Sequence, residues 1–170
     1  MEPYQLTITE MASSIRKGDL SPVELMESLL HRSGQLGDEL KVWVNLDPET
    51  LMKLARESES NLVAKGPQGM LDGIPIGLKD IFCTEGIPTT ACSDLFRDFI
   101  PDYDATSVSM LKNSGAIVMG KLVTTAYAAL DPSPTLNAWD KTLTPGGSSS
   151  GSAVSVATGI CPGALGSQTV

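Results

Sequence analysis

The sequence has no cluster of basic residues, no long apolar run and only one histidine. Its formal net charge is −8 and it has no cluster of lysine and arginine, which argues against direct binding to nucleic acid or to an anionic membrane surface. No apolar run approaches the ~20 residues of a membrane span. Residues 1–4 (MEPY) lack the basic and apolar regions of a secretory signal peptide. We therefore expect a cytoplasmic protein that binds neither nucleic acid directly nor a membrane.

Cysteine is scarce as well. The three cysteines, Cys83, Cys92 and Cys161, are odd in number and widely spaced, and none forms a C-x-x-C metal or redox motif. We interpret them as core or incidental thiols in a reducing cytoplasm. The only histidine, His31, falls near the end of a predicted helix. A lone, exposed imidazole is more often structural than catalytic, so we assign it no role.

The composition indicates a folded domain rather than a disordered chain. Hydrophobic residues make up 41% of the 170 residues and charged residues 19%, which suits a packed core in one domain. Three helices are predicted between about residues 7 and 66, from capping residues, prolines and closing glycines. Their start and stop signals are Thr7 with Glu10 and Gly18, Ser21 with Pro22 and Glu24, and residues 47–49 with Gly66.

From about residue 69 the pattern changes to short apolar segments that are typical of buried strands. The strand candidates are residues 74–78, 116–120 and 164–166, with a shorter one at 42–46. A helix is predicted from about Ala105 to Asn113, capped by Asp104 and ended by Gly115. Strand, helix, strand is the order of a βαβ unit. The sequence therefore predicts an α/β fold with a largely parallel sheet covered by helices.

A glycine- and serine-rich stretch occupies residues 144–153 (TPGGSSSGSA) and runs directly into an apolar segment. A flexible linker would continue polar, so we interpret this stretch as a loop that enters a helix. Gly146 and Gly151 have the spacing of a phosphate-binding loop. That motif then needs a lysine and a hydroxyl residue, whereas Ser152 and Ala153 stand there, so a phosphate loop is excluded.

Two serine-based sites remain for the same stretch. Residues 147–151 spell G-x-S-x-G, a nucleophile elbow centred on Ser149. That site needs a histidine farther along the chain, but His31 lies far upstream. A serine site whose base is a lysine needs no histidine, so this sequence can supply it.

Lys79 is the one lysine in the glycine-rich, strand-like segment at residues 71–81. A lysine at a strand end usually reaches solvent, and this is the interpretation that the segment by itself favours. The alternative is that the apolar neighbours Ile76, Leu78 and Ile81 bury it. Burial disfavours an ammonium ion, and a neutral amine is a competent proton acceptor.

Four segments in a fixed order resemble the amidase signature family. Residues 73–80 (GIPIGLKD) are similar to the lysine segment of that family, and residues 86–90 (GIPTT) to the segment that follows it. Residues 137–140 (NAWD) with 145–153 (PGGSSSGSA) are similar to its serine-glycine segment, and residues 164–170 (ALGSQTV) to the start of its nucleophile segment. The resemblance covers nearly the whole chain, and the combination of segments makes it specific.

The resemblance implies a Ser-cisSer-Lys site. Lys79 would be the catalytic lysine, and Ser148, held by a cis peptide bond, would be the serine that relays protons. The nucleophilic serine of the family falls just beyond Val170, and the backbone N–H groups of Thr169 and Val170 match two donors of its oxyanion hole. The implied reaction cleaves the C–N bond of a small-molecule amide through an acyl-enzyme, without a metal or an organic cofactor.

The resemblance also has implications for the chain as a whole. It implies that residues 1–170 are the N-terminal portion of one amidase signature domain, with a helical segment at about 7–66 and an α/β core from about 69. The sheet would be mixed, largely parallel and incomplete, and the piece itself would be inactive. The alternatives are a subunit of an amidotransferase and a non-catalytic scaffold that keeps the fold. A homo-oligomer is compatible with the resemblance.

The sequence departs from the pattern of the family at two positions. Many members have Asp where Gln168 stands and Asn where Val123 stands, so the hydrogen bonds around these positions are expected to differ. Residues 127–131 are the local candidates for a wall of the substrate pocket. The sequence does not specify the amide substrate.

Overall fold

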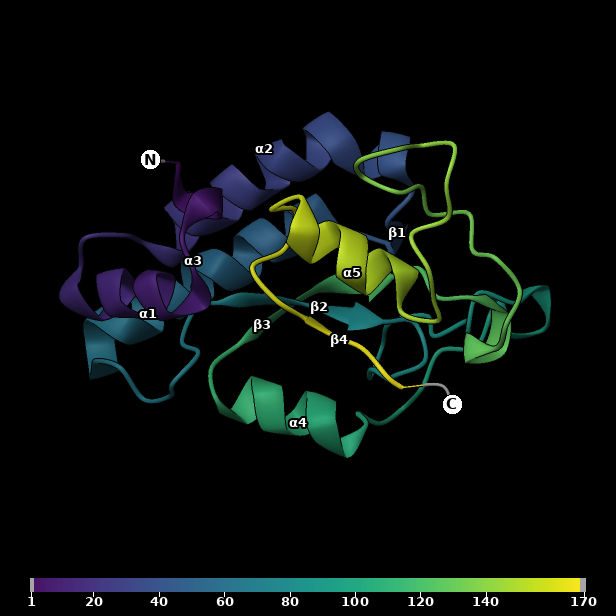
Figure 1. Cartoon of the computed structure of the whole chain (residues 1–170). Coiled ribbons are helices and arrows are strands. Elements are labelled where there is room, and N and C mark those ends of the chain that lie inside the picture. The colour runs from purple at the N-terminus through teal and green to yellow at the C-terminus, as the bar shows by residue number, and fades with distance from the viewer. Residues whose placement is uncertain (1, 169–170) are drawn as a thin grey trace.

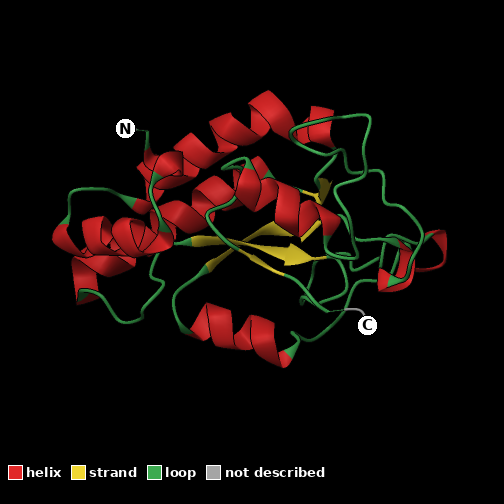
Figure 2. Cartoon of the chain, viewed as in Figure 1, coloured by secondary structure: helices red, strands yellow, loops and turns green. Residues whose placement is uncertain are grey.

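The computed structural model describes residues 2–168, and in them a four-stranded mixed sheet has helices on both faces (Figures 1 and 2). The strands, in spatial order, are β1 (Trp43–Asn45), β3 (Ile117–Leu122), β2 (Pro75–Lys79) and β4 (Ala164–Leu165). Strand β2 runs parallel to both β3 and β4, whereas β1 runs antiparallel to β3. The α/β class and the mixed, largely parallel sheet are therefore confirmed.

The N-terminal part of the chain is helical, as its capping signals predict. Thr7 and Ser21 each form a capping box, with the carboxylates of Glu10 and Glu24, and Gly18 ends the first helix in a left-handed conformation at φ +77°. The apolar faces of these helices pack into the core with the sheet. The helices are α1 (Ile8–Lys17), α2 (Pro22–Leu40) and α3 (Pro48–Lys65).

Helix α2 extends farther than the sequence indicated. Because it runs to Leu40, the prediction that His31 lies near a helix end is wrong, and the exposed imidazole sits in the middle of the helix. Lys41 in a left-handed conformation closes the helix instead of a glycine, so the usual stop signal is absent from the sequence.

Helix α4 (Thr106–Asn113) connects β2 to β3 and completes the βαβ unit. The prediction that Asp104 caps this helix is wrong, since Ala105 occupies the N-cap without a side-chain hydrogen bond. The Asp104 carboxylate instead accepts hydrogen bonds from Lys112 Nζ at 2.6 Å and from the backbone N–H of Glu85 at 2.9 Å. An ionised donor makes the stronger bond, which accounts for the different partner.

Helix α5 (Ser150–Ala157) lies on the face of the sheet opposite α4 (Figure 1). Its first turn touches the backbone at the end of β3, and Gly151 makes this approach feasible. A Cβ atom at Gly151 would lie 2.6 Å from the Val123 nitrogen and 2.7 Å from the Val42 carbonyl oxygen. The Gly151 N–H donates to the Val123 carbonyl at 2.9 Å, so the helix start is fixed to the sheet.

The remaining elements are short. The predicted strand at residues 164–166 is observed as β4, but it is half-buried rather than buried, because it lies at an edge of the described sheet. No helix among residues 2–168 combines the length and the apolar character needed to cross a membrane. Short 3-10 helices occur at Pro3–Gln5, Asp94–Phe96 and Ala126–Ala128.

Candidate active site

Lys79 is the last residue of β2, and its side chain is fully buried. Its Nζ lies 2.5 Å from Ser148 Oγ and 2.7 Å from Ser167 Oγ, so it is hydrogen-bonded to both hydroxyls. The prediction of a buried lysine within hydrogen-bond reach of Ser148 is confirmed, and the solvent-facing interpretation is wrong. Among the ion pairs of residues 2–168, none involves Lys79. Burial lowers the pKa of Lys79, which favours a neutral amine.

Ser148 lies in the loop before α5, directly after a cis peptide bond between Gly147 and Ser148. Its side chain is buried. Its carbonyl oxygen accepts hydrogen bonds from the Thr125 N–H and the Thr124 hydroxyl, both at 3.0 Å. The cis peptide bond that the resemblance implied is therefore observed, and two residues that follow β3 hold the backbone of Ser148.

Ser149 supports the site through its neighbour Ser167. The Ser149 hydroxyl donates to the Ser167 carbonyl and accepts from the Ser167 N–H, each at 3.1 Å. This reciprocal pair fixes the segment that follows β4 and thereby directs the Ser167 hydroxyl toward Lys79. Ser149 thus holds backbone atoms in this structure, and the elbow interpretation gains no support from it.

Two further serines of the glycine-rich stretch bind the sheet. The Ser152 hydroxyl donates to the Leu165 carbonyl at 3.0 Å, and the Ser150 hydroxyl donates to the Val123 carbonyl at 3.4 Å. Both serines are buried. The stretch therefore fastens α5 to β3 and β4 while it presents Ser148 to Lys79.

Sequence reasoning missed Ser167 and a second buried lysine. The signal for Ser167 was its position after a strand candidate, since the carboxyl ends of parallel strands meet at one edge of a sheet. Leu78 pairs with Leu165 in the parallel register, so the residues after these strands converge. The second lysine, Lys121 in β3, forms an ion pair with Asp80 at 3.5 Å, and both side chains are fully buried. No local pattern in the sequence indicates this pair, in which Asp80 has Lys121, rather than the adjacent Lys79, as its ion-pair partner.

The other positions singled out in the sequence differ in how the structure describes them. Thr169 and Val170, the expected oxyanion-hole donors, lie outside the described residues. Val123 is buried, and its backbone bonds to Val42 and Gly151. Gln168 is exposed. Tyr127 is half exposed, and its hydroxyl bonds to that of Ser93 at 2.6 Å.

The described residues offer a cleft of about 580 Å³, but it lies elsewhere, between α3, α4 and β3. Neither Lys79 nor Ser148 lines it. Among residues 2–168, no group of three histidine, cysteine or carboxylate side chains is arranged to hold a metal ion. The reactive groups that the structure brings together are the buried Lys79 amine and the hydroxyls of Ser148 and Ser167, and a neutral amine beside a hydroxyl can accept its proton.

Comparison with known sequences gives a consistent set of relatives. The sequence model of the Amidase family matches residues 24–170. AmiD of Mycobacterium tuberculosis, whose name places it among the amidases, is 43% identical over 169 residues, which cover 97% of this chain and 36% of AmiD. One subunit of the glutamyl-tRNA(Gln) amidotransferase of Chloroflexus aurantiacus is 37% identical over 174 residues, covering 99% of this chain and 36% of that protein.

Solved structures agree with the sequence comparison. A fatty acid amide hydrolase superposes with a TM-score of 0.89 at 26% identity, over 96% of this chain and 30% of that one. The native peptide amidase of Stenotrophomonas maltophilia superposes with a TM-score of 0.87 at 29% identity, over 95% of this chain and 36% of that one. The chain thus spans about a third of the length of the curated relatives it matches.

Proposed function

Because this chain belongs to the amidase family, we propose that the protein containing it is an amidohydrolase that cleaves the C–N bond of a small-molecule amide. Its residues 1–170 form the N-terminal part of one domain, with a helical segment at about 7–66 and an α/β core from about 69. The observation that carries the proposal is the 2.5 Å separation of Lys79 Nζ and Ser148 Oγ in a buried site.

In the proposed reaction, neutral Lys79 accepts the proton of Ser148, while Ser148 accepts the proton of a nucleophilic serine. The resemblance to the amidase signature family puts that serine just after Val170. The activated serine oxygen attacks the amide carbonyl, and backbone N–H groups at Thr169 and Val170 stabilise the oxyanion. Ser148 then returns a proton to the departing amine, and the acyl-enzyme remains.

Water completes the cycle by the same route. Ser148, backed by Lys79, removes a proton from the water molecule that attacks the acyl-enzyme, and the carboxylic acid leaves as the nucleophilic serine is reprotonated. Every proton in this scheme moves among water, substrate and the hydroxyl and amine groups of the chain. The scheme assigns no task to a metal or an organic cofactor.

A role within an amidotransferase is the second candidate. It is favoured by relatives that are named as subunits of glutamyl-tRNA(Gln) amidotransferase, at 37% to 41% identity. The same amine and hydroxyl pair would serve it, with the ammonia passed to an acceptor on a partner protein rather than released. A non-catalytic scaffold that keeps the fold is the third.

The test compares the intact protein with its Lys79→Met and Ser148→Ala variants on a panel of simple amides, with Lys112→Met as a surface-lysine control. We expect ammonia or amine release by the wild type and the control, and its loss in the other two. Release only in the presence of a partner protein identifies the amidotransferase. No release under either condition, with a residue other than serine at the nucleophile position beyond Val170, supports the scaffold.

A further inference from the structure

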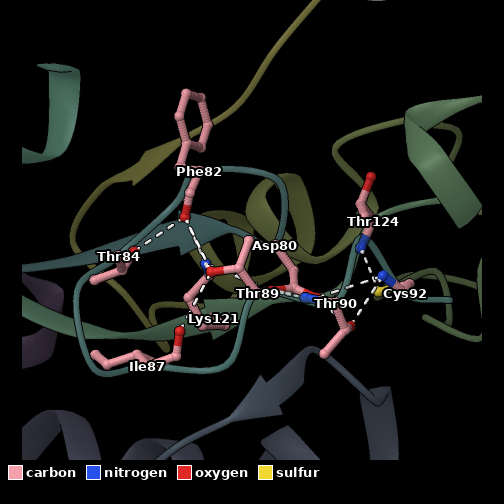
Figure 3. Close-up of polar contacts among 9 residues, drawn as sticks. All are labelled: Asp80, Phe82, Thr84, Ile87, Thr89, Thr90, Cys92, Lys121 and Thr124. Atoms are coloured by element: carbon pink, nitrogen blue, oxygen red, sulfur yellow. Dashed lines mark hydrogen bonds and ion pairs between the residues drawn. The ribbon is translucent and has the colours of Figure 1, made fainter. Parts of the chain in front are cut away.

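The buried pair of Lys121 and Asp80 has no task in the reaction proposed above. Lys121 lies in β3, and Asp80 directly follows Lys79 at the end of β2. Both side chains are fully buried, with Lys121 Nζ and Asp80 Oδ1 3.5 Å apart (Figure 3). A buried ion pair is weak evidence for stability, because the desolvation of two charges offsets their attraction. A contribution to stability therefore does not by itself explain the pair.

The Lys121 ammonium binds the segment that follows Lys79. It donates to the Phe82 carbonyl at 2.6 Å and to the Thr89 hydroxyl at 2.7 Å, in addition to its ion pair with Asp80 (Figure 3). An ammonium has three N–H donors, and these three acceptors match them in number. All three belong to residues 80–89, so one side chain from β3 fixes the path of the chain as it leaves β2.

The Asp80 carboxylate extends the network toward Ser148. It accepts from the Thr90 hydroxyl at 2.5 Å and from the Cys92 N–H at 3.4 Å. The Cys92 sulfur in turn accepts from the Thr124 N–H at 3.3 Å (Figure 3). The Thr124 hydroxyl donates to the Ser148 carbonyl. A continuous series of contacts thus joins the residue after Lys79 to the backbone of Ser148.

The sheet also separates the Lys79 amine from the ion pair of Lys121 and Asp80. Lys79 pairs with Leu122 in the parallel register, one position beyond Lys121, so the two lysines point to opposite faces of the sheet. Lys79 meets hydroxyls, whereas Lys121 meets Asp80. The thiols of Cys83 and Cys92 are the other titratable groups that interact electrostatically with Lys121. On the face of Lys79, the thiol of Cys161 packs near Gly77, and burial raises its pKa to about 12, so it stays neutral.

The charge of Asp80 has a direct consequence for the reaction. A carboxylate near a lysine favours the ammonium form, and an ammonium cannot accept the proton of Ser148. Burial lowers the pKa of Lys121, and the charge of Asp80 opposes this effect without cancelling it. The three acceptors around Lys121 Nζ are the observation that suits an ammonium. While Lys121 occupies Asp80, the carboxylate has a partner other than Lys79.

We propose that Lys121 is a positioning residue of the active site. It holds Asp80 and the Phe82 carbonyl, which fixes the segment after Lys79, and through Asp80, Cys92 and Thr124 it supports the backbone of Ser148. It also keeps the Asp80 carboxylate occupied. This inference rests on the proposed function, because positioning is defined by the proton transfer between Lys79 and Ser148.

The experiment measures kcat, KM and their pH dependence in the intact protein for Lys121→Met, Lys121→Arg and the double variant Asp80→Asn/Lys121→Met. Lys112→Met is the matched control, since it removes a partly exposed lysine that is paired with Asp104 at 2.6 Å. We expect Lys121→Met to lower kcat by roughly 10²-fold with little change in KM, the loss typical of a misplacement of about 1 Å. In the pH–rate profile of Lys121→Met, the limb on the acidic side should move to higher pH by roughly 1 unit, because an unpaired Asp80 carboxylate favours the ammonium form of Lys79.

The other variants separate positioning from stability. The double variant leaves no unpaired buried charge, so its acidic limb should return toward that of the wild type, with kcat higher than in Lys121→Met. Lys121→Arg keeps the charge and should be intermediate, because the planar guanidinium fits the three acceptors differently. Lys112→Met should match the wild type. A Lys121→Met protein with the kcat and acidic limb of the wild type would overturn the proposal, even if its melting temperature were lower.

A measurement that does not depend on catalysis separates the proposed positioning role of Lys121 from the proposed amidohydrolase function. NMR titration of ¹³Cε-labelled lysine, with the Lys79 signal assigned from Lys79→Arg, should show a higher Lys79 pKa in Lys121→Met than in the wild type. If the wild type hydrolyses no amide but this shift occurs, the proposed function fails and the positioning stands. If amide hydrolysis depends on Lys79 but the titration is unchanged, the positioning fails and the function stands. If Lys121→Met does not fold, the double variant decides, and a Lys79 pKa and kcat equal to those of Asp80→Asn alone would contradict the proposal.

Discussion

Lys79 and Lys121 occupy adjacent parallel strands, one register position apart, and are both fully buried, yet only Lys121 has a carboxylate partner among the described residues. Lys79 has the hydroxyls of Ser148 and Ser167 instead. The same residue type thus has two environments in one sheet. The carboxylate of Asp80 favours the charged form of Lys121, whereas the two hydroxyls suit a neutral amine at Lys79.

The pH dependence of activity follows from the environment of Lys79. Burial lowers the pKa of Lys79 from its ordinary value of 10.5, and the neutral amine is the reactive form. We expect kcat/KM of the intact protein to rise with pH through an inflection below 10.5, and Lys79→Met to lower kcat by roughly 10²- to 10⁴-fold. A pH–rate series on the wild type and the variant measures both. An activity that falls as pH rises through this range would contradict a neutral lysine as the base.

The same shift affects stability in a defined direction. A lysine with a lowered pKa in the folded state binds its proton more weakly there than in the unfolded chain. The free energy of unfolding should therefore rise with pH between the folded pKa and 10.5, and Lys79→Met should remove this component. Denaturant unfolding of both proteins across that range, with Lys112→Met as a control, measures the difference.

Ser167 should orient the Lys79 amine. A neutral amine donates through its N–H groups and accepts through one lone pair, so an N–H directed at Ser167 leaves the lone pair for the Ser148 hydroxyl. We expect Ser167→Ala to lower kcat by roughly tenfold, the value of one hydrogen bond of about 1.4 kcal/mol, with little change in KM. Ser167→Thr keeps the hydroxyl and should retain most of the activity. Equal kcat in Ser167→Ala and wild type would rule this orientation out.

Gly151 should tolerate no side chain. Its added Cβ would lie 2.6 Å from the Val123 nitrogen, a backbone atom that is fixed by a hydrogen bond to the Val42 carbonyl. We expect Gly151→Ala to reduce the free energy of unfolding by roughly 1–3 kcal/mol or more, as overpacking does. Gly34→Ala is the matched control, because it lies within α2 with no atom within 4 Å of the new Cβ, and it should stabilise by roughly 0.5–1 kcal/mol. Denaturant unfolding of the two variants gives the comparison, and equal stabilities would contradict the packing argument.

Residues 1–170 expressed alone should lack amidase activity, since the proposed nucleophile lies beyond Val170 and the proton relay then has nothing to activate. The piece should also be poorly stable, because its sheet edges and its cleft between α3, α4 and β3 would face water. Sedimentation and thermal unfolding test this. A soluble monomer with a cooperative transition would contradict the instability, and turnover of a simple amide would contradict the mechanism.

Local signals predicted the helices well, because a capping box is complete within four residues and needs no tertiary partner. Thr7 with Glu10 is one example. The predictions were wrong where the structure depends on a partner that the local pattern does not include. Asp104, for example, binds the Lys112 ammonium, and Ala105 occupies the N-cap of α4 instead. The segment around Lys79 by itself favoured solvent exposure, since the loop and strand that bury it lie far along the chain. The resemblance to a family, rather than any local pattern, predicted its contact with Ser148.

The partners of Lys79 are separated from it by 69 residues for Ser148 and 88 residues for Ser167. Contacts between such distant positions require closure of long loops, and the entropy of that closure is lost before the contact forms. The Ser149 clamp, in turn, needs the segment after β4 in place. During synthesis on the ribosome, Lys79 therefore emerges 69 residues before Ser148 and 88 residues before Ser167, so its amine has neither hydroxyl partner until both loops have closed.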